Sequence, residues 1–242
     1  MPSKTVTLNS PPLQPSGSLP PGTLRVLQIT DSHIYADPEG RLAGVKTQQT
    51  LDDVLQMAKR DFWQADMVLA TGDLVHDATP TGYRRIKQRL RTLDAPIYCL
   101  PGNHDLPQVM NDCLDRSGVT APKAVRQGNW LIILHDSTVP GSPEGHLSSQ
   151  ELETLDDNLR RHADCHALVC LHHHPVAVGS AWIDRMALDN PEEFFRIIDR
   201  YPKVRGVLWG HIHQLFEAER HRVKLMGSPS TCIQFMPRRD NF

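Results

Sequence analysis

Five short segments of the chain carry side chains that bind divalent metal ions: Asp31-Ser32-His33, Gly72-Asp73, Gly102-Asn103-His104-Asp105, His172-His173-His174-Pro175 and Gly210-His211-Ile212-His213. Four of the five directly follow a run of aliphatic residues. In α/β proteins such runs are buried strands, and ligand sites form beyond their carboxyl ends. Each segment alone is a weak signal, but in this order they predict a single two-metal hydrolytic site.

The spacing within two segments indicates how they could hold the ions. Residues i and i+2 of an extended chain point the same way and lie about 6.5 to 7 Å apart. Asp31 and His33 should then face one side of a loop, and so should His211 and His213. The ions of two-metal sites lie roughly 3.5 to 4 Å apart, so each pair can grip one ion or give one ligand to each ion.

The remaining donors suggest which metals fit. Asp73 suits a carboxylate that bridges the ions, and Asn103 adds a neutral oxygen. Nitrogen and oxygen donors without thiolates fit Fe, Mn or Zn and not a structural zinc site. Glycine precedes Asp73, Asn103 and His211, where a turn and close backbone approach are needed. Taken singly, a Gly-Asp pair is an ordinary turn and the histidine triplet could be a surface tract.

Bulk composition excludes several classes of protein. The 242 residues include 26 Lys and Arg against 28 Asp and Glu, for a net charge of −2. This balance offers no basic excess for binding nucleic acid through phosphates. No apolar run reaches the roughly 18 to 20 residues that cross a bilayer, and no signal peptide is recognisable. The five cysteines show no paired spacing, so we expect a cytoplasmic protein with free thiols.

Alternating patterns predict the elements that position the five segments. Helical spacing and capping residues predict helices over 47–59, 79–93, 148–163 and 190–200. Apolar runs predict strands over 24–29, 67–70, 96–100, 130–134, 166–171 and 204–209, followed by strands alone over 215–219, 223–226 and 231–236. The expected fold is α/β, an α+β sandwich of two sheets flanked by helices. We expect a disordered Pro- and Ser-rich leader over 1–22 and one domain over 23–242; the oligomeric state is open.

The order of the motifs carries a family resemblance. The chain contains, in this order, the motifs D-x-H, G-D, G-N-H-D, H-x-x-P and G-H-x-H. As a set they resemble the calcineurin-like metallophosphoesterase superfamily over residues 24–242. Further stretches resemble the bacterial class III cyclic 3′,5′-AMP phosphodiesterases: 27–31, 100–105, 171–175, 210–214 and 229–235.

The resemblance implies that seven residues hold the metals: Asp31, His33 and His213 the first ion, Asp73 both ions, and Asn103, His172 and His211 the second. Within the triplet we choose His172, because the ligand of related sequences stands three residues before a proline that matches Pro175. The resemblance implies a substrate contact for His33, Asp73, Asn103, His104, His174 and His213.

His104 follows a metal ligand directly and completes neither ligand set. The resemblance implies that His104 contacts the phosphate and protonates the leaving oxygen as the catalytic acid. An ordinary histidine pKa of about 6.5 suits that role near neutral pH. Some relatives orient this histidine with an aspartate three residues after the bridging one. Here that position is His76 with Asp77 beside it, so the orienting residue is open.

The leading hypothesis is hydrolysis of cyclic 3′,5′-AMP to 5′-AMP by a hydroxide held between two metal ions, Fe with Mn or a second Fe, with Zn as an alternative. A second hypothesis keeps this chemistry for another phosphodiester, a nucleotide diphosphate derivative or a phosphomonoester. A third, an inactive scaffold, predicts lost ligands, whereas all seven and His104 are present.

Overall fold

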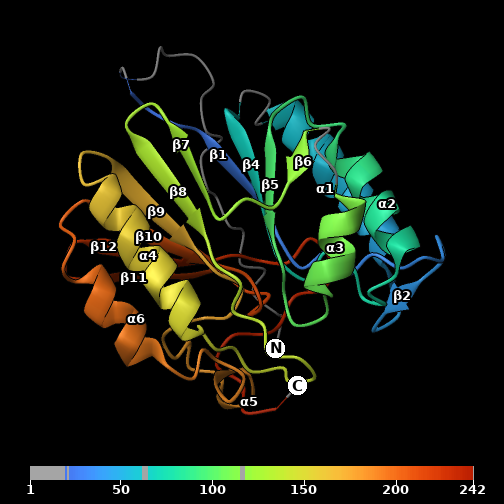
Figure 1. Ribbon diagram of the computed structural model, residues 1–242. Helices are drawn as coiled ribbons and strands as arrows, with labels where there is room; N and C mark the ends of the chain where they lie inside the picture. The colour runs from blue at the N-terminus through green and yellow to red at the C-terminus, as the bar shows by residue number, and fades with distance from the viewer. Residues whose placement is uncertain (1–19, 21, 62–64, 115–117, 242) are drawn as a thin grey trace, which may run out of the picture.

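Two β-sheets lie face to face between two groups of helices in the computed structural model (Figure 1). The structure describes residues 20, 22–61, 65–114 and 118–241, so the predicted leader falls almost entirely outside the described residues. The α/β class and the two-sheet core flanked by helices are as the sequence predicts. The single-domain boundary at residue 23 stays a prediction.

The first sheet is parallel throughout, in the order β1-β4-β5-β6. Its strands are β1 (Val26–Ile29), β4 (Met67–Thr71), β5 (Ile97–Leu100) and β6 (Val119–Thr120). Its helices are α1 (Thr47–Asp61), α2 (Pro80–Leu90) and α3 (Pro107–Cys113). A small hairpin of β2 (Arg41–Leu42) and β3 (Val45–Lys46) precedes α1. These helices cover the outer face of the sheet (Figure 1).

The second sheet has the order β11-β12-β10-β9-β8-β7, with antiparallel pairing only at its two edges. Its strands are β7 (Ala124–Gln127), β8 (Trp130–Leu134), β9 (His166–Cys170), β10 (Val204–Trp209), β11 (Phe216–Arg220) and β12 (Val223–Gly227). Its helices are α4 (Ser149–Arg161), α5 (Ala181–Asp184) and α6 (Pro191–Ile198). The Ser148 side chain caps α4 by accepting from the Glu151 amide, as the capping pattern predicts.

An apolar layer joins the inner faces of the sheets. It contains Met67, Leu69 and Leu100 from the first sheet and Ile132, Leu134, Cys170 and Leu208 from the second. Strand β4 is buried along its whole length, which explains why its sequence is a continuous apolar run. Buried strands give the loops that follow them a rigid base.

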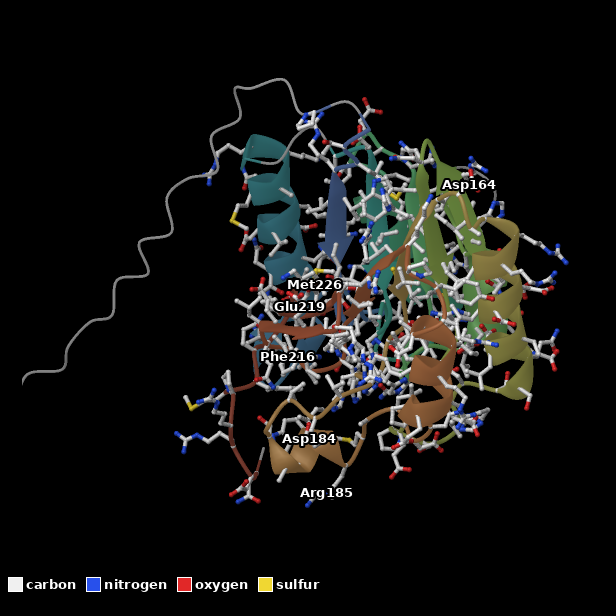
Figure 2. The ribbon with its side chains drawn as sticks, turned by 90° about the vertical axis from the view of Figure 1, so that its left-hand side faces the viewer. Asp164, Asp184, Arg185, Phe216, Glu219 and Met226 are labelled. Atoms are coloured by element: carbon white, nitrogen blue, oxygen red, sulfur yellow. The ribbon has the colours of Figure 1, made fainter. Side chains whose placement is uncertain are left out.

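The carboxyl ends of the central strands of both sheets point toward the same end of the molecule. Figure 2 labels Asp184 of α5 at this end, beyond β9, and Asp164 at the opposite end, just before β9. The five candidate segments lie in the loops that leave β1, β4, β5, β9 and β10 at this end.

Two details of the sequence prediction are wrong. Residues 231–236 form no strand, because their hydrogen-bonding groups are used by neighbouring loops and not by a strand partner. Short elements such as α3, α5, β6 and β7 were not predicted. None of the helices in the described part of the chain combines the length and apolar character needed to cross a bilayer.

Candidate metal centre

Two buried carboxylates, Asp31 and Asp73, form the middle of the site. They follow β1 and β4, and the loops that carry them run side by side. The Asp31 amide donates to the Gly72 carbonyl over 3.0 Å, and the His33 amide donates to the Asp73 carbonyl over 2.9 Å. The parallel pairing of the strands thus continues into the loops and fixes one carboxylate beside the other.

The first group of candidate ligands is Asp31, His33 and His213. Nε2 of His213 lies 3.3 Å from Oδ1 of Asp31 and 3.4 Å from Nε2 of His33. One donor atom from each of the three residues lies within 4.8 Å of the others, and all three side chains are buried. The structure therefore brings together the three residues expected to hold the first ion.

Asp73 lies between this group and His172. Its Oδ2 is 3.6 Å from Nε2 of His33 and 3.5 Å from Nε2 of His172. The same nitrogen of His172 is 3.2 Å from Oδ1 of Asn103, while its Nδ1 donates to the Thr71 carbonyl over 2.9 Å. This central position matches the bridging role expected for Asp73.

His211 contributes both its backbone and its ring. Its amide lies 3.1 Å from each carboxylate oxygen of Asp31. Its Nε2 is buried and has no hydrogen-bond partner among the described residues, although donor atoms of His172, His173 and His211 lie within 4.8 Å of one another. A buried imidazole nitrogen without a partner is costly unless something unseen satisfies it. A metal ion at this position would do so.

The other two histidines of the triplet have different surroundings. Nδ1 of His173 lies 2.8 Å from the Ser137 hydroxyl. His174 is fully buried, with Nε2 3.4 Å from Oδ1 of Asp184 and its ring stacked near His211. The substrate contact expected for His174 stays a prediction. Of the triplet, His172 is the one beside Asp73 and Asn103.

Five of the candidate ligands adopt left-handed backbone conformations, with φ between 44° and 67°: Asp31, His33, Asp73, His211 and His213. The extended geometry assumed for the i, i+2 pairs is therefore wrong. Non-glycine residues rarely adopt this conformation, and Asp, Asn and His do so more readily than most. Such strain concentrates at functional sites, where the surrounding structure imposes it.

Two glycines allow the loops to pack this closely. A Cβ on Gly102 would lie 2.3 Å from Oδ1 of Asp73 and 2.8 Å from Cε1 of His172. A Cβ on Gly72 would lie 2.4 Å from Nδ1 of His172, and Gly72 itself has φ 95°. Neither position has room for another residue without displacing a candidate ligand.

Burial and mutual charge control protonation in the site. Burial lowers the pKa of His33 to about 3, so its ring is neutral and can offer a lone pair. Burial alone would raise the pKa of Asp73, but His172 and then His33 outweigh it and hold that pKa well below its usual range. Burial opposes the charged form of His172, but Asp73 and then Asp31 raise its pKa to about 9. The carboxylates of Asp31 and Asp73 therefore stabilise a positive charge at the place where a cation would fit.

His104 lies at the partly exposed side of the site. Its amide donates to Oδ1 of Asp73 over 2.9 Å, and its ring lies 4.9 Å from that of His33. Its ring also stacks on His76, with centroids 4.6 Å apart and planes 23° apart. The side chain of Asp77 accepts from the Ala36 amide and from Thr79 instead, so Asp77 is not placed to orient His104.

Sequence reasoning missed the role of Asp105. This buried carboxylate accepts from the amides of Gly102 and Leu74 and from the Tyr83 hydroxyl, over 2.9, 3.1 and 3.0 Å. It ties the loop after β4 to the loop after β5. Burial and the neighbouring Asp73 raise its pKa to about 7. Its place in the Gly-Asn-His-Asp segment was the only signal in the sequence.

The chain beyond β12 forms a support behind the first group. The Ser230 hydroxyl donates to the Asp31 carbonyl over 2.8 Å, and the Thr231 amide donates to the Thr30 carbonyl over 3.0 Å. His213 donates from Nδ1 to the Ile233 carbonyl over 2.8 Å, which directs its Nε2 into the site. These bonds explain why 231–236 forms no strand.

Comparisons with known proteins identify the family of this chain. The chain matches the family model described as calcineurin-like phosphoesterase over residues 24–215. It is 38% identical over 228 residues to the 3′,5′-cyclic adenosine monophosphate phosphodiesterase CpdA of Vibrio vulnificus, covering 94% of this chain and 83% of the relative. It is 41% identical over 219 residues to a 3′,5′-cyclic-nucleotide phosphodiesterase of Nostoc, covering 90% and 82%. A dimetal phosphatase from Danio rerio has a similar fold, with TM-score 0.65, 13% identity and coverage of 86% and 88%.

The chain therefore belongs to the calcineurin-like phosphoesterase family. The family and the hydrolase class predicted from its motifs are confirmed. Membership also implies divalent metal ions, and the buried Asp and His groups described above fit them.

Proposed function

We propose that this protein hydrolyses 3′,5′-cyclic AMP to 5′-AMP at a two-metal centre. The observation that carries the proposal is the position of Asp73, whose Oδ2 lies 3.5 to 3.6 Å from the Nε2 atoms of both His172 and His33. The names of the Vibrio and Nostoc relatives, which match most of this chain, support the cyclic nucleotide as substrate.

In this proposal the ligands are those expected from the motifs: Asp31, His33 and His213 for the first ion, Asp73 for both, and Asn103, His172 and His211 for the second. When bound, such ions stabilise charge on phosphate oxygens and lower the pKa of water. The donor set contains nitrogen and oxygen but no thiolate, which supports Fe with Mn or a second Fe, with Zn as the alternative.

His104 is the proposed catalytic acid. It is partly exposed, whereas the histidine ligands are buried, so a substrate could reach it. Its backbone bond to Asp73 holds it beside the proposed bridging carboxylate. From there its ring could contact the phosphate and give a proton to the departing 3′ oxygen, a contribution typically worth 10²- to 10⁴-fold in rate. His33, Asp73, Asn103 and His213 would line the same phosphate position.

The remaining expectations are part of the proposal. We propose one domain from residue 23, supported by the apolar layer shared by both sheets. We also propose a cytoplasmic location, supported by the free cysteines. The partner would be a small cyclic nucleotide and not a nucleic acid, because the charge is balanced.

A substrate panel tests the proposal. Metal content of the purified protein is measured together with initial rates on cyclic AMP, bis(p-nitrophenyl) phosphate and p-nitrophenyl phosphate. We expect about two metal ions per chain and 5′-AMP as the product of the preferred substrate. A preference for the monoester over both diesters would contradict the diesterase assignment. Absence of bound transition metal together with absence of turnover would contradict the proposal as a whole.

A further inference from the structure

The histidine ligands differ in what holds the ring nitrogen that faces away from the site. Nδ1 of His172 donates to the Thr71 carbonyl and Nδ1 of His213 donates to the Ile233 carbonyl. A carbonyl only accepts, so Nδ1 carries a hydrogen in each ring, and Nε2 is the nitrogen that binds a metal once its own proton is lost. Such partners fix both the tautomer and the orientation of a metal-binding histidine.

No carbonyl of the described residues takes this position beside His33. Its Nδ1 lies 3.2 Å from Nδ1 of His76, another imidazole nitrogen that can either donate or accept. Nε2 of His33 faces Asp73 and His213, at 3.6 and 3.4 Å. For this nitrogen to bind a metal, the neutral ring of His33 must carry its hydrogen on Nδ1, and Nδ1 of His76, 3.2 Å away, is placed to accept it.

Three contacts hold His76 in place. Its amide donates to the Ile34 carbonyl over 2.9 Å. Its ring packs against that of Tyr35, with centroids 4.8 Å apart, and stacks on that of His104, with centroids 4.6 Å apart. The contact with His33 is therefore built by the fold and not by a freely turning side chain.

We propose that His76 is a positioning residue that accepts the Nδ1 hydrogen of His33 and thereby directs the Nε2 lone pair of His33 into the first metal position. The inference rests on the metal centre proposed above. A residue that orients a ligand in this way typically contributes 10- to 100-fold to metal affinity. His76 also covers one face of the His104 ring, so one side chain touches both a proposed ligand and the proposed acid.

Two substitutions separate these roles. In His76→Asn the amide oxygen can accept near the position of Nδ1, but the aromatic face is lost. In His76→Phe the aromatic face remains, but the acceptor is lost. His162, at the end of α4 far from the site, provides matched controls as His162→Asn and His162→Phe.

The readout is equilibrium binding of Mn²⁺ to metal-free protein, followed by calorimetry and by metal analysis after gel filtration. Far-ultraviolet circular dichroism and a thermal melt establish that each variant is folded. We expect His76→Phe to weaken binding of one of two ions by 10- to 100-fold. His76→Asn and both His162 variants should stay within about threefold of the wild type.

The proposal is overturned if folded His76→Phe binds both ions like the wild type, or if His76→Asn is as weak as His76→Phe. Neither outcome contradicts the proposed function, because that function is judged by metal binding and turnover of cyclic AMP in the wild type. A wild type that binds no metal would overturn both together.

Discussion

The ring of Phe235 lies flat against the ring of His213, with centroids 4.1 Å apart and planes 4° apart. The Phe235 amide also donates to the His213 carbonyl over 3.0 Å. Together with the bond from His213 to the Ile233 carbonyl, this stack leaves the His213 ring one orientation. A residue of the final segment thus restrains a proposed ligand of the first ion.

Phe235→Leu keeps apolar volume but removes the flat face. Aromatic pairs contribute about 0.5 to 1.5 kcal/mol beyond the area they bury, so we expect metal affinity to fall about two- to tenfold. Calorimetric titration of metal-free protein with Mn²⁺ measures the effect. Phe216→Leu is the matched control, because the Phe216 ring packs at a tilt against Trp209 and not against a proposed ligand. Equal metal affinity in Phe235→Leu and the wild type would show that the stack does not restrain His213.

His104→Ala should retain both metal ions and lose at least about 100-fold in turnover of cyclic AMP, because the proposed acid is removed while the ligands stay in place. Metal analysis and the rate of 5′-AMP formation are measured on the same preparation. His162→Ala serves as the control. Unchanged turnover in His104→Ala would remove this residue from the mechanism.

Gly102→Ala should abolish or strongly weaken metal binding. The added Cβ would lie 2.3 Å from Oδ1 of Asp73, so the carboxylate or the loop must move. Overpacking of this kind costs about 1 to 3 kcal/mol. The control is Gly141→Ala, where the added Cβ meets nothing within 4 Å. Gly141 has φ 77°, so this variant should lose some stability, but it should keep its metal. Normal metal content in Gly102→Ala would contradict the close approach seen at this loop.

The metal-free protein should lose stability as the pH falls below 6.5. Burial lowers the pKa of His33 to about 3, whereas an exposed histidine titrates near 6.5. Between these values the unfolded chain binds a proton that folded His33 does not, so acid favours unfolding. One such group lowers the free energy of unfolding by about 1.4 kcal/mol for each pH unit of acidification.

His33→Gln is neutral at every pH and removes this contribution. Its free energy of unfolding should fall less between pH 6.5 and 4.5 than that of the wild type, by up to about 3 kcal/mol. Urea unfolding at both pH values measures the difference, and His162→Gln should behave like the wild type. Identical pH dependence in His33→Gln and the wild type would show that His33 is not held neutral by burial.

The sequence predicted the parts of the fold that rest on long patterns. Strands such as β4 and β8 are continuous apolar runs, and α2 and α4 begin at capping residues that the structure uses. The motifs likewise predicted which loops meet, because parallel strands bring their carboxyl ends to one edge. Short elements such as α3 and β6 carry too few residues to show a period.

What the sequence could not predict depends on contacts between distant segments. Residues 231–236 alternate like a strand, yet their polar groups bond to Thr30 and His213 of the site loops. The contact between His76 and His33 is set by the parallel course of two loops, and no local pattern indicates it. No local pattern predicts the buried donors around Asp105 either, because they come from another loop or from a turn.

The five proposed ligands with a left-handed backbone can be replaced only by residues that meet two requirements. A substitute must offer a donor atom, and it must also tolerate positive φ, which β-branched side chains do not. Asparagine meets both demands better than glutamate or cysteine, so metal selectivity cannot be changed freely by exchanging side chains at these positions. Anyone transplanting this centre into another scaffold must carry over the turns as well as the ligands. The donor atoms and the left-handed turns that carry them work only in combination.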